Sequence, residues 1–244
     1  MSVIYKKIVV VNYTGTMGKT TLTAFLLSPR MPGAPIIAVE SINETAETLG
    51  LGVEKFRGDQ FRDVFQRLML EDHAIVDVGA SNVEDFMASL EDFEEAHEEI
   101  DFYVIPVTPG TKEQQETMAM INSLAALGIP PTKIRVVFNR VKRDVSSEFS
   151  IIKAYHAASK TFWINDACAV FETELFSALA IKRLSLQKLM SDDVDYKTLL
   201  KNKEASAEER AAWSDMYGLR LLCNGVNRKL DYVFSTLISE GDNN

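Results

Sequence analysis

The stretch NYTGTMGKTT, residues 12–21, carries the clearest structural signal in the chain. It follows the apolar run IVVV at residues 8–11 and leads into TLTAFLL at residues 21–27, so a glycine-rich turn joins a predicted strand to a predicted helix. Backbone N–H groups in such a turn converge on an anion, and the helix N-terminus adds partial positive charge. The alternative is a glycine-rich turn that caps an ordinary helix. The strand before it and the helix after it favour a phosphate-binding loop.

Each residue type in this stretch suits one part of a bound nucleotide. Gly15 and Gly18 have no side chain to hold the backbone away from phosphate oxygens. Lys19 would neutralise the β- and γ-phosphates, and the Thr20 hydroxyl suits a magnesium ion. Thr21 can bond the α-phosphate. The loop is therefore predicted to bind a nucleotide together with magnesium.

Further β-branched runs alternate with helical patterns along the chain. They lie at residues 36–39, 74–78, 102–107 and 134–138, and a shorter run at 162–164 is a candidate further strand. These runs do not alternate apolar and polar residues, which is typical of strands buried on both faces of a parallel sheet. Residues 111–127 between two of them have helical spacing and end at Gly128. The pattern predicts an α/β fold with a doubly wound, mostly parallel sheet and helices on both faces.

The last third of the chain has a helical pattern. Residues from about 170 to 240 are expected to form C-terminal helices that pack on a single domain spanning residues 1–244. The charged segment at 191–211 is predicted to be either a loop or a mobile helical excursion.

Composition narrows the functional classes. The net charge of −9 disfavours direct, non-specific binding to DNA, although residues 133–143 carry five basic side chains that could form a local basic face. No apolar stretch approaches the ~20 residues of a membrane span. Cys168 and Cys223 form no disulfide framework and no metal-ligand spacing. We expect a reduced, cytoplasmic protein.

Two polar residues at predicted strand ends are further site candidates. Asp77 ends the run at 74–78 and precedes Gly79, which suits a carboxylate that holds a magnesium-bound water. The alternative is an aspartate that caps a turn. Asn139 follows the run at 134–138, and its amide can pair with the donor and acceptor groups of a purine.

These motifs carry a family resemblance. NYTGTMGKTT resembles the deviant Walker A loop of the ParA/MinD family, usually written KGGxGKTT. Residues 102–121 resemble that family's next strand and helix, and VVFNR at 136–140 resembles its base-recognition strand. More narrowly, the chain is similar to the StbB-type plasmid stability proteins, a ParA-like branch. The resemblance covers roughly residues 5–180 and implies a P-loop NTPase fold of the SIMIBI type.

The resemblance also implies roles for individual residues. Asp77 would be the Walker B carboxylate and Asn139 the base-reading amide, with magnesium held at Thr20 and Asp77. The implied catalytic residues are Lys19, Asp77 and Glu40. Nucleotide contacts are implied for Gly15, Thr16, Gly18, Lys19, Thr20 and Thr21.

The chain departs from the family pattern at two positions. The family's signature lysine, which reaches the phosphates of the partner in a dimer, falls at Thr14, and a neutral hydroxyl cannot replace that cation. Of the two acids that follow the second strand, the first is Glu40 and the second falls at Ile42, which cannot position water. Glu40, Ser41 or Asn43 could take over that task.

Three functions remain open from the sequence. The leading hypothesis is a ParA-like switch in plasmid partition or stability, or in conjugative transfer. It would bind ATP or ADP with Mg²⁺, dimerise on ATP, hydrolyse slowly or with stimulation, and act with a DNA-binding partner protein. The second is a non-hydrolysing adaptor with a degenerate nucleotide site. The third is a small-molecule kinase or ligase of the dethiobiotin-synthetase type.

Overall fold

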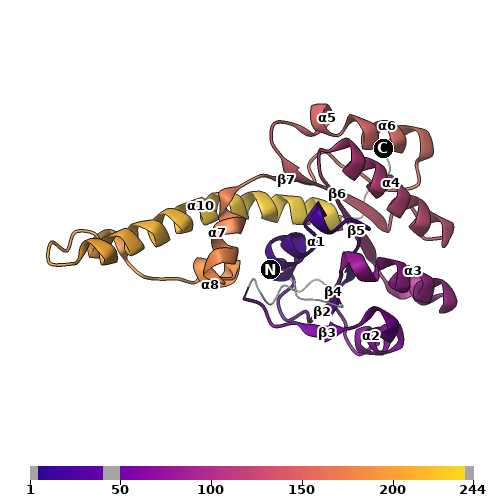
Figure 1. Ribbon diagram of the computed structural model, residues 1–244, viewed down its shortest axis with the longest axis horizontal. Coiled ribbons are helices and arrows are strands. Elements are labelled where there is room, and N and C mark those ends of the chain that lie inside the picture. The colour runs from indigo at the N-terminus through magenta and orange to yellow at the C-terminus, as the bar shows by residue number, and fades with distance from the viewer. Residues whose placement is uncertain (1–4, 41–49, 240–244) are drawn as a thin grey trace.

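The computed structural model describes residues 5–40 and 50–239. Seven strands form one parallel sheet in the order β3–β2–β4–β1–β5–β6–β7 (Figure 1). The predicted α/β class and parallel sheet are therefore confirmed. The strands are β1 (Lys7–Val10), β2 (Ile36–Val39), β3 (Glu54–Phe56), β4 (Ala74–Val78), β5 (Phe102–Val107), β6 (Ile134–Val141) and β7 (Ala169–Phe171).

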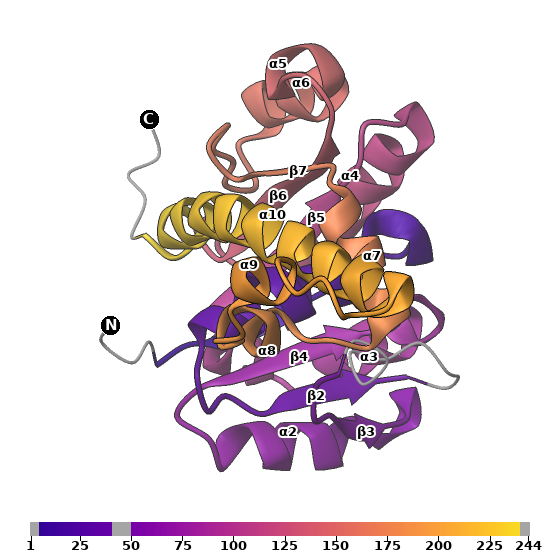
Figure 2. The same ribbon diagram turned by 90° about the vertical axis from the view of Figure 1, so that its left-hand side faces the viewer.

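Helices cover both faces of this sheet, as predicted (Figures 1 and 2). One face carries α2, α3, α4 and α6, and the other carries α1 with the turns that follow it, α7, α8 and α10. The helices are α1 (Lys19–Thr21), α2 (Phe61–Met69), α3 (Val83–Asp92), α4 (Thr111–Ala126), α5 (Val145–Glu148), α6 (Ser150–Ser159), α7 (Glu174–Lys182), α8 (Leu186–Met190), α9 (Tyr196–Leu199) and α10 (Ala207–Ile238).

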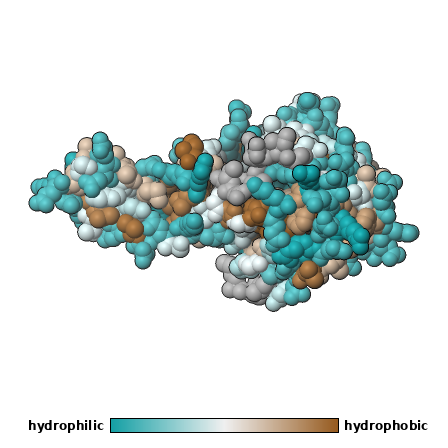
Figure 3. Space-filling model, turned by 60° about the horizontal axis from the view of Figure 1, so that its bottom comes forward, coloured by the Kyte–Doolittle hydropathy of each residue, from teal (hydrophilic) through white to brown (hydrophobic). Residues whose placement is uncertain are grey.

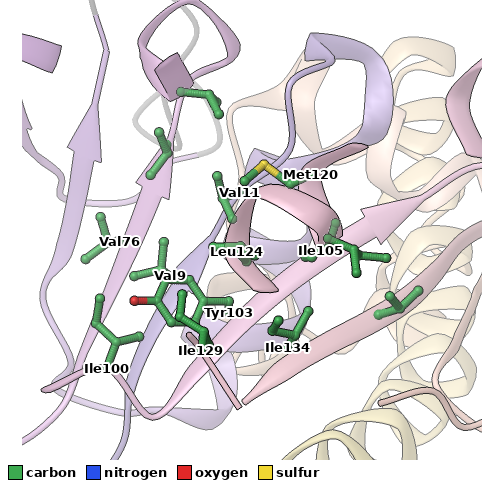
Figure 4. Packing of buried hydrophobic residues seen from close by; sticks show 14 of the residues in the cluster. Val9, Val11, Val76, Ile100, Tyr103, Ile105, Met120, Leu124, Ile129 and Ile134 are labelled. Carbon is green, nitrogen blue, oxygen red and sulfur yellow. The ribbon is translucent and has the colours of Figure 1, made fainter. Parts of the chain in front are cut away.

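The centre of the sheet is buried on both faces, which explains its near-continuous apolar runs. In Figure 4, Val9 and Tyr103 of neighbouring strands lie on the face of the sheet that α4 covers, together with Met120 and Leu124 of that helix. All four side chains are at most 1% exposed. Burial of such a side chain stabilises the fold by about 1.5–3 kcal/mol, so β1, β5 and α4 form a rigid platform beneath the turn that follows β1.

The long helix α10 has two parts. It begins with a capping box in which Ser206 accepts from the Glu209 backbone N–H and the Glu209 carboxylate accepts from the Ser206 backbone N–H. Its buried residues lie between Leu219 and Leu237, where it packs on the sheet. The amino-terminal part projects from the body in Figure 1, and Figure 3 shows only small apolar patches on this projection, separated by hydrophilic surface.

A buried arginine holds the carboxyl end of α10. The Arg135 guanidinium lies 4.6 Å from the Phe102 ring centroid and 4.4 Å from that of Trp163. It donates to the Leu237 carbonyl at 3.3 Å and to the Ser239 carbonyl at 3.1 Å. These carbonyls lie at the negative end of the helix dipole. The guanidinium therefore supplies hydrogen bonds to carbonyls that lack a partner within the helix, and its positive charge interacts favourably with the dipole.

Three sequence-based assignments need correction. The predicted strand at 162–164 is only an isolated bridge between Trp163 and Arg135. The helical pattern expected from about residue 170 is preceded by β7, and β3 was not predicted at all. The two edge strands β3 and β7 have three residues each. In β3 two of the three are the charged residues Glu54 and Lys55, and the apolar β7 is too short to stand out from the helical pattern around it. None of the helices among the described residues has the length and apolar character needed to cross a membrane.

Candidate functional site

The predicted site residues gather at one edge of the sheet. All strands are parallel, so the ends of β1, β2, β4 and β6 meet there. Asp77 of β4 pairs in register with Val10 of β1 and Ala38 of β2, which places it beside the loop that follows β1. Glu40 directly follows β2, and Asn139 lies in β6. The topology thus brings together residues that are distant in the sequence.

The loop has the backbone geometry of an anion cradle. Residues Gly15–Met17 form a 3₁₀ turn, Gly18 adopts a left-handed conformation with φ of 84°, and helix α1 begins at Lys19. A Cβ at Gly18 would lie 2.5 Å from Asn139 Nδ2, so both the backbone and the space require glycine there. Gly15 and Thr16 are exposed at the rim, where a ligand can reach their backbone N–H groups. A succession of turn, left-handed residue and helix start is typical of phosphate-binding nests.

Lys19 is buried at the base of this loop. Its ammonium donates to the Asn12 carbonyl at 2.8 Å and to the Thr14 carbonyl at 3.0 Å. Burial lowers the pKa of Lys19 to about 8, while the carboxylates of Asp77 and Glu40 act in the opposite direction. The ammonium is therefore held by weak neutral acceptors, and a phosphate would be a stronger partner.

Asp77 and Thr20, the predicted magnesium residues, are neighbours. Asp77 is 5% exposed, and burial raises its pKa to about 6 against the effects of the Thr20 hydroxyl and the Lys19 charge. Its Oδ1 is buried without a hydrogen-bond partner among the described residues. An orphaned carboxylate oxygen beside a threonine hydroxyl fits a magnesium ion, which takes few protein ligands and completes its shell with water and phosphate.

Glu40 lies within the same group of residues. A Cβ at Gly79 would lie 2.6 Å from Glu40 Cγ, so the glycine after Asp77 leaves room for this glutamate. Its charge also acts on Lys19. Ile42, Ser41 and Asn43, named above for the second acid position, lie outside the described residues.

Thr14 and its neighbour Tyr13 are both bound to α4. The Thr14 hydroxyl donates to the Glu116 carboxylate, and the same carboxylate lies 3.5 Å from the Lys112 ammonium. The Tyr13 hydroxyl lies 3.0 Å from Ser123 Oγ. The Glu116 contact was not predicted, because no local pattern in the sequence reveals which face of α4 meets the loop.

Asn139 of β6 holds the loop from the side of β1 opposite Asp77 and β4. Its Nδ2 donates to the Met17 carbonyl at 2.8 Å, and its Oδ1 accepts from the Arg140 backbone N–H at 3.0 Å. An amide has two N–H donors and two acceptor lone pairs, so each atom keeps capacity for one further bond. Base reading by this amide remains a prediction.

A cavity of about 290 Å³ opens next to Asn139. It also reaches Thr21, the residue expected at the α-phosphate, so it adjoins both residues for which base and α-phosphate contacts are predicted. Phe25 and Phe176 stack in its wall, with ring centroids 4.7 Å apart. No sequence pattern points to the cavity residues contributed by β7, by α7 and by the link between them, which are Phe171, Glu172, Thr173, Phe176, Ser177 and Ala180.

The sheet order and this loop together define a P-loop ATPase-like α/β fold. No protein-family model and no curated protein matches the sequence. Among solved structures, an ATP complex of McdA from Cyanothece is similar with a TM-score of 0.52 and 16% identity, covering 89% of this chain and 98% of that chain. The MinC:MinD complex of Aquifex aeolicus is similar with a TM-score of 0.51 and 15% identity, covering 90% of this chain and 96% of that chain. The pNOB8 ParA is similar with a TM-score of 0.50 and 11% identity, covering 96% of this chain and 99% of that chain. These TM-scores show that the chain shares its fold with the ParA, MinD and McdA proteins, and at 11–16% identity the likeness extends to the fold alone.

Proposed function

We propose that this chain is a cytoplasmic ParA-like protein that binds Mg²⁺-ATP and acts as a dimerisation switch in plasmid partition or stability, or in conjugative transfer. The observation that carries the proposal is the buried pair of Lys19 and Asp77 beneath the left-handed Gly18. A buried lysine and a buried carboxylate with an orphaned oxygen are costly unless a ligand uses them. The resemblance to StbB-type proteins supports the plasmid context.

Each residue would contribute one step to nucleotide handling. The Lys19 ammonium would move from the Asn12 and Thr14 carbonyls to the phosphate oxygens. Thr20 and Asp77 would hold the magnesium ion directly or through water, and the ion would neutralise charge on the phosphates. Glu40 is the described residue best placed to orient a water molecule, since it adjoins both Gly79 and Lys19.

The proposed switch is the change between a monomer and an ATP-bound homodimer. The carboxyl edge of the sheet would form the homodimer face with ATP bound. A relative of known structure, MinD, is found in complex with its partner MinC, which supports a role for a second protein here as well. A net charge of −9 favours a separate DNA-binding partner over direct contact with DNA.

One observation favours the adaptor alternative. Thr14 provides no cation, and its hydroxyl is already bonded to Glu116 within the same chain. A protein of this kind could bind nucleotide for structural reasons and hydrolyse none.

Calorimetry with Mg²⁺-ATP and Mg²⁺-ADP, phosphate release and light scattering would test the proposal on one sample. We expect binding to both nucleotides, dimers only with ATP, and slow turnover that Lys19→Ala abolishes. Binding without turnover or dimers would establish the adaptor instead. No binding to either nucleotide would refute a functional loop.

A further inference from the structure

A groove at the β7 edge of the sheet shares Phe171 with the cavity beside Asn139 but contains no residue of the phosphate loop. It has a volume of about 400 Å³ and is formed by β7, by α10 and by the turn that leads into α5. In Figures 1 and 2, β7 lies between α10 and the α5–α6 pair, because α10 covers one face of the sheet and α6 the other. The groove therefore continues the plane of the sheet beyond its last strand.

The backbone of β7 directs hydrogen-bonding groups into this groove. The Cys168 carbonyl accepts from the Phe138 backbone N–H at 2.9 Å, and the Glu172 N–H donates to the Val141 carbonyl at 3.0 Å, so residues 168 and 172 face β6. Backbone groups alternate between the two sides of a strand. Ala169 and Phe171, which both line the groove, consequently present their N–H and carbonyl groups to its interior.

The groove combines exposed aromatic side chains with two cations. Two aromatic residues are unusually exposed for their size, Phe171 at 44% and Tyr232 at 64%. The Lys229 ammonium lies 5.8 Å from the Phe171 ring centroid, and Arg143 lies near the opposite wall. Within the described part of the chain, neither cation has a carboxylate oxygen within 4.0 Å.

The acids of the groove are already bonded. Asp144 accepts from the Ser147 backbone N–H at 2.8 Å and from the Ser147 hydroxyl at 2.7 Å, as the cap of α5. Asp166 forms an ion pair with Lys153 at 2.6 Å. The charges left to meet a ligand are therefore positive, in a protein whose overall charge is strongly negative.

We propose that this groove binds an extended, acidic peptide segment of a partner protein, which adds as a strand along the open edge of β7. Main-chain bonds to Ala169 and Phe171 would give affinity, as in other cases of strand addition. An apolar residue of the segment would pack between Phe171 and Tyr232, and flanking carboxylates would pair with Arg143 and Lys229. The proposal does not depend on nucleotide binding, since none of these side chains belongs to the phosphate loop.

The first test is to select peptides from a random phage-displayed library on the full-length protein and to measure the best one, synthesised with a fluorescent label, by polarisation. We expect acidic peptides with a central apolar residue. Arg143→Glu combined with Lys229→Glu should weaken binding at least tenfold, and Tyr232→Ser should weaken it as well. Lys201→Glu with Lys203→Glu is an equal charge change at exposed positions just before α10, whose start lies roughly 30 Å along the helix from Lys229, and it should leave binding unchanged. Selection of no peptide, or equal binding by the groove variants, would overturn the proposal.

Hydrogen exchange on the same complex tests the mode of binding. Strand addition should slow exchange of the Ala169 and Phe171 amides, whereas a helix lying in the groove would leave them exchanging as before. The second result would refute strand addition even if the peptide binds.

Discussion

At the scale of single residues, the buried ammonium of Lys19 should make nucleotide affinity depend on pH. Its pKa in the free protein is about 8, and bound phosphates would raise it. Below pH 8 the group is charged in both states, so Lys19 adds no pH dependence there. Above pH 8 binding must take up a proton, so we expect the affinity to fall about tenfold per pH unit. Calorimetry with Mg²⁺-ADP between pH 6.5 and 9.5 would measure this, and the weaker binding of Lys19→Ala should lack the same break.

A second prediction at this scale concerns the missing cation. In Thr14→Lys the new ammonium would lie beside Glu116, the present partner of the Thr14 hydroxyl, and would reach the phosphates of the partner subunit in the proposed ATP dimer. A positioned charge that stabilises the transition state is worth roughly 10²–10³ in rate, so phosphate release should rise by tenfold or more. Thr14→Met has a long side chain without charge and serves as the control. An equal rise in Thr14→Met would contradict an electrostatic cause.

At the scale of elements, two glycines weaken α10. Gly218 and Gly225 lie inside the helix, and a Cβ at either position meets no atom within 4 Å. Each glycine costs roughly 0.5–1 kcal/mol relative to alanine, so Gly218→Ala with Gly225→Ala should stabilise the protein by about 1–2 kcal/mol. Denaturant unfolding followed by circular dichroism would measure the gain.

Gly128 provides the matched control for this prediction. A Cβ there also meets nothing within 4 Å, but φ is 81°. Gly128→Ala should therefore destabilise the protein by about 1 kcal/mol, through backbone strain alone. The same sign of change in both variants would show that helix propensity is not the cause.

The elements also show where sequence reasoning succeeds. The central strands were predicted because burial on both faces demands an apolar run, and the loop because glycine and lysine at fixed spacing have a definite backbone role. The strands β3 and β7 were missed because edge pairing imposes no such pattern. The bond between Thr14 and Glu116, and the cavity beside Asn139, depend on how α4, β7 and α7 pack on the sheet. No local signal encodes that packing.

At the scale of the whole molecule, the phosphate loop and the projecting helix are physically connected. The helix that starts at Lys19 changes into a π-helical turn over Leu22–Leu27, a rare geometry that often occurs near functional sites. The 3₁₀ turn that follows ends at Arg30, which is 7% exposed and lies against α10. The segment that would bind phosphate is therefore rigidly linked to the helix that extends away from the body.

This link predicts that nucleotide binding alters the dynamics of α10. Arg30 donates to the Phe25 and Leu26 carbonyls at 3.0 and 3.1 Å, and to the Asn227 carbonyl at 2.9 Å. It also pairs with Asp231 at 2.8 Å. Ordering of the loop by Mg²⁺-ADP should reach α10 through these bonds and slow hydrogen exchange around Asn227. In Arg30→Met that protection should fall at least threefold, while Asp231→Asn, which keeps a neutral acceptor, should retain most of it. Equal protection in Arg30→Met would mean that the two elements respond to nucleotide independently, and that the projecting helix is a passive extension of the fold.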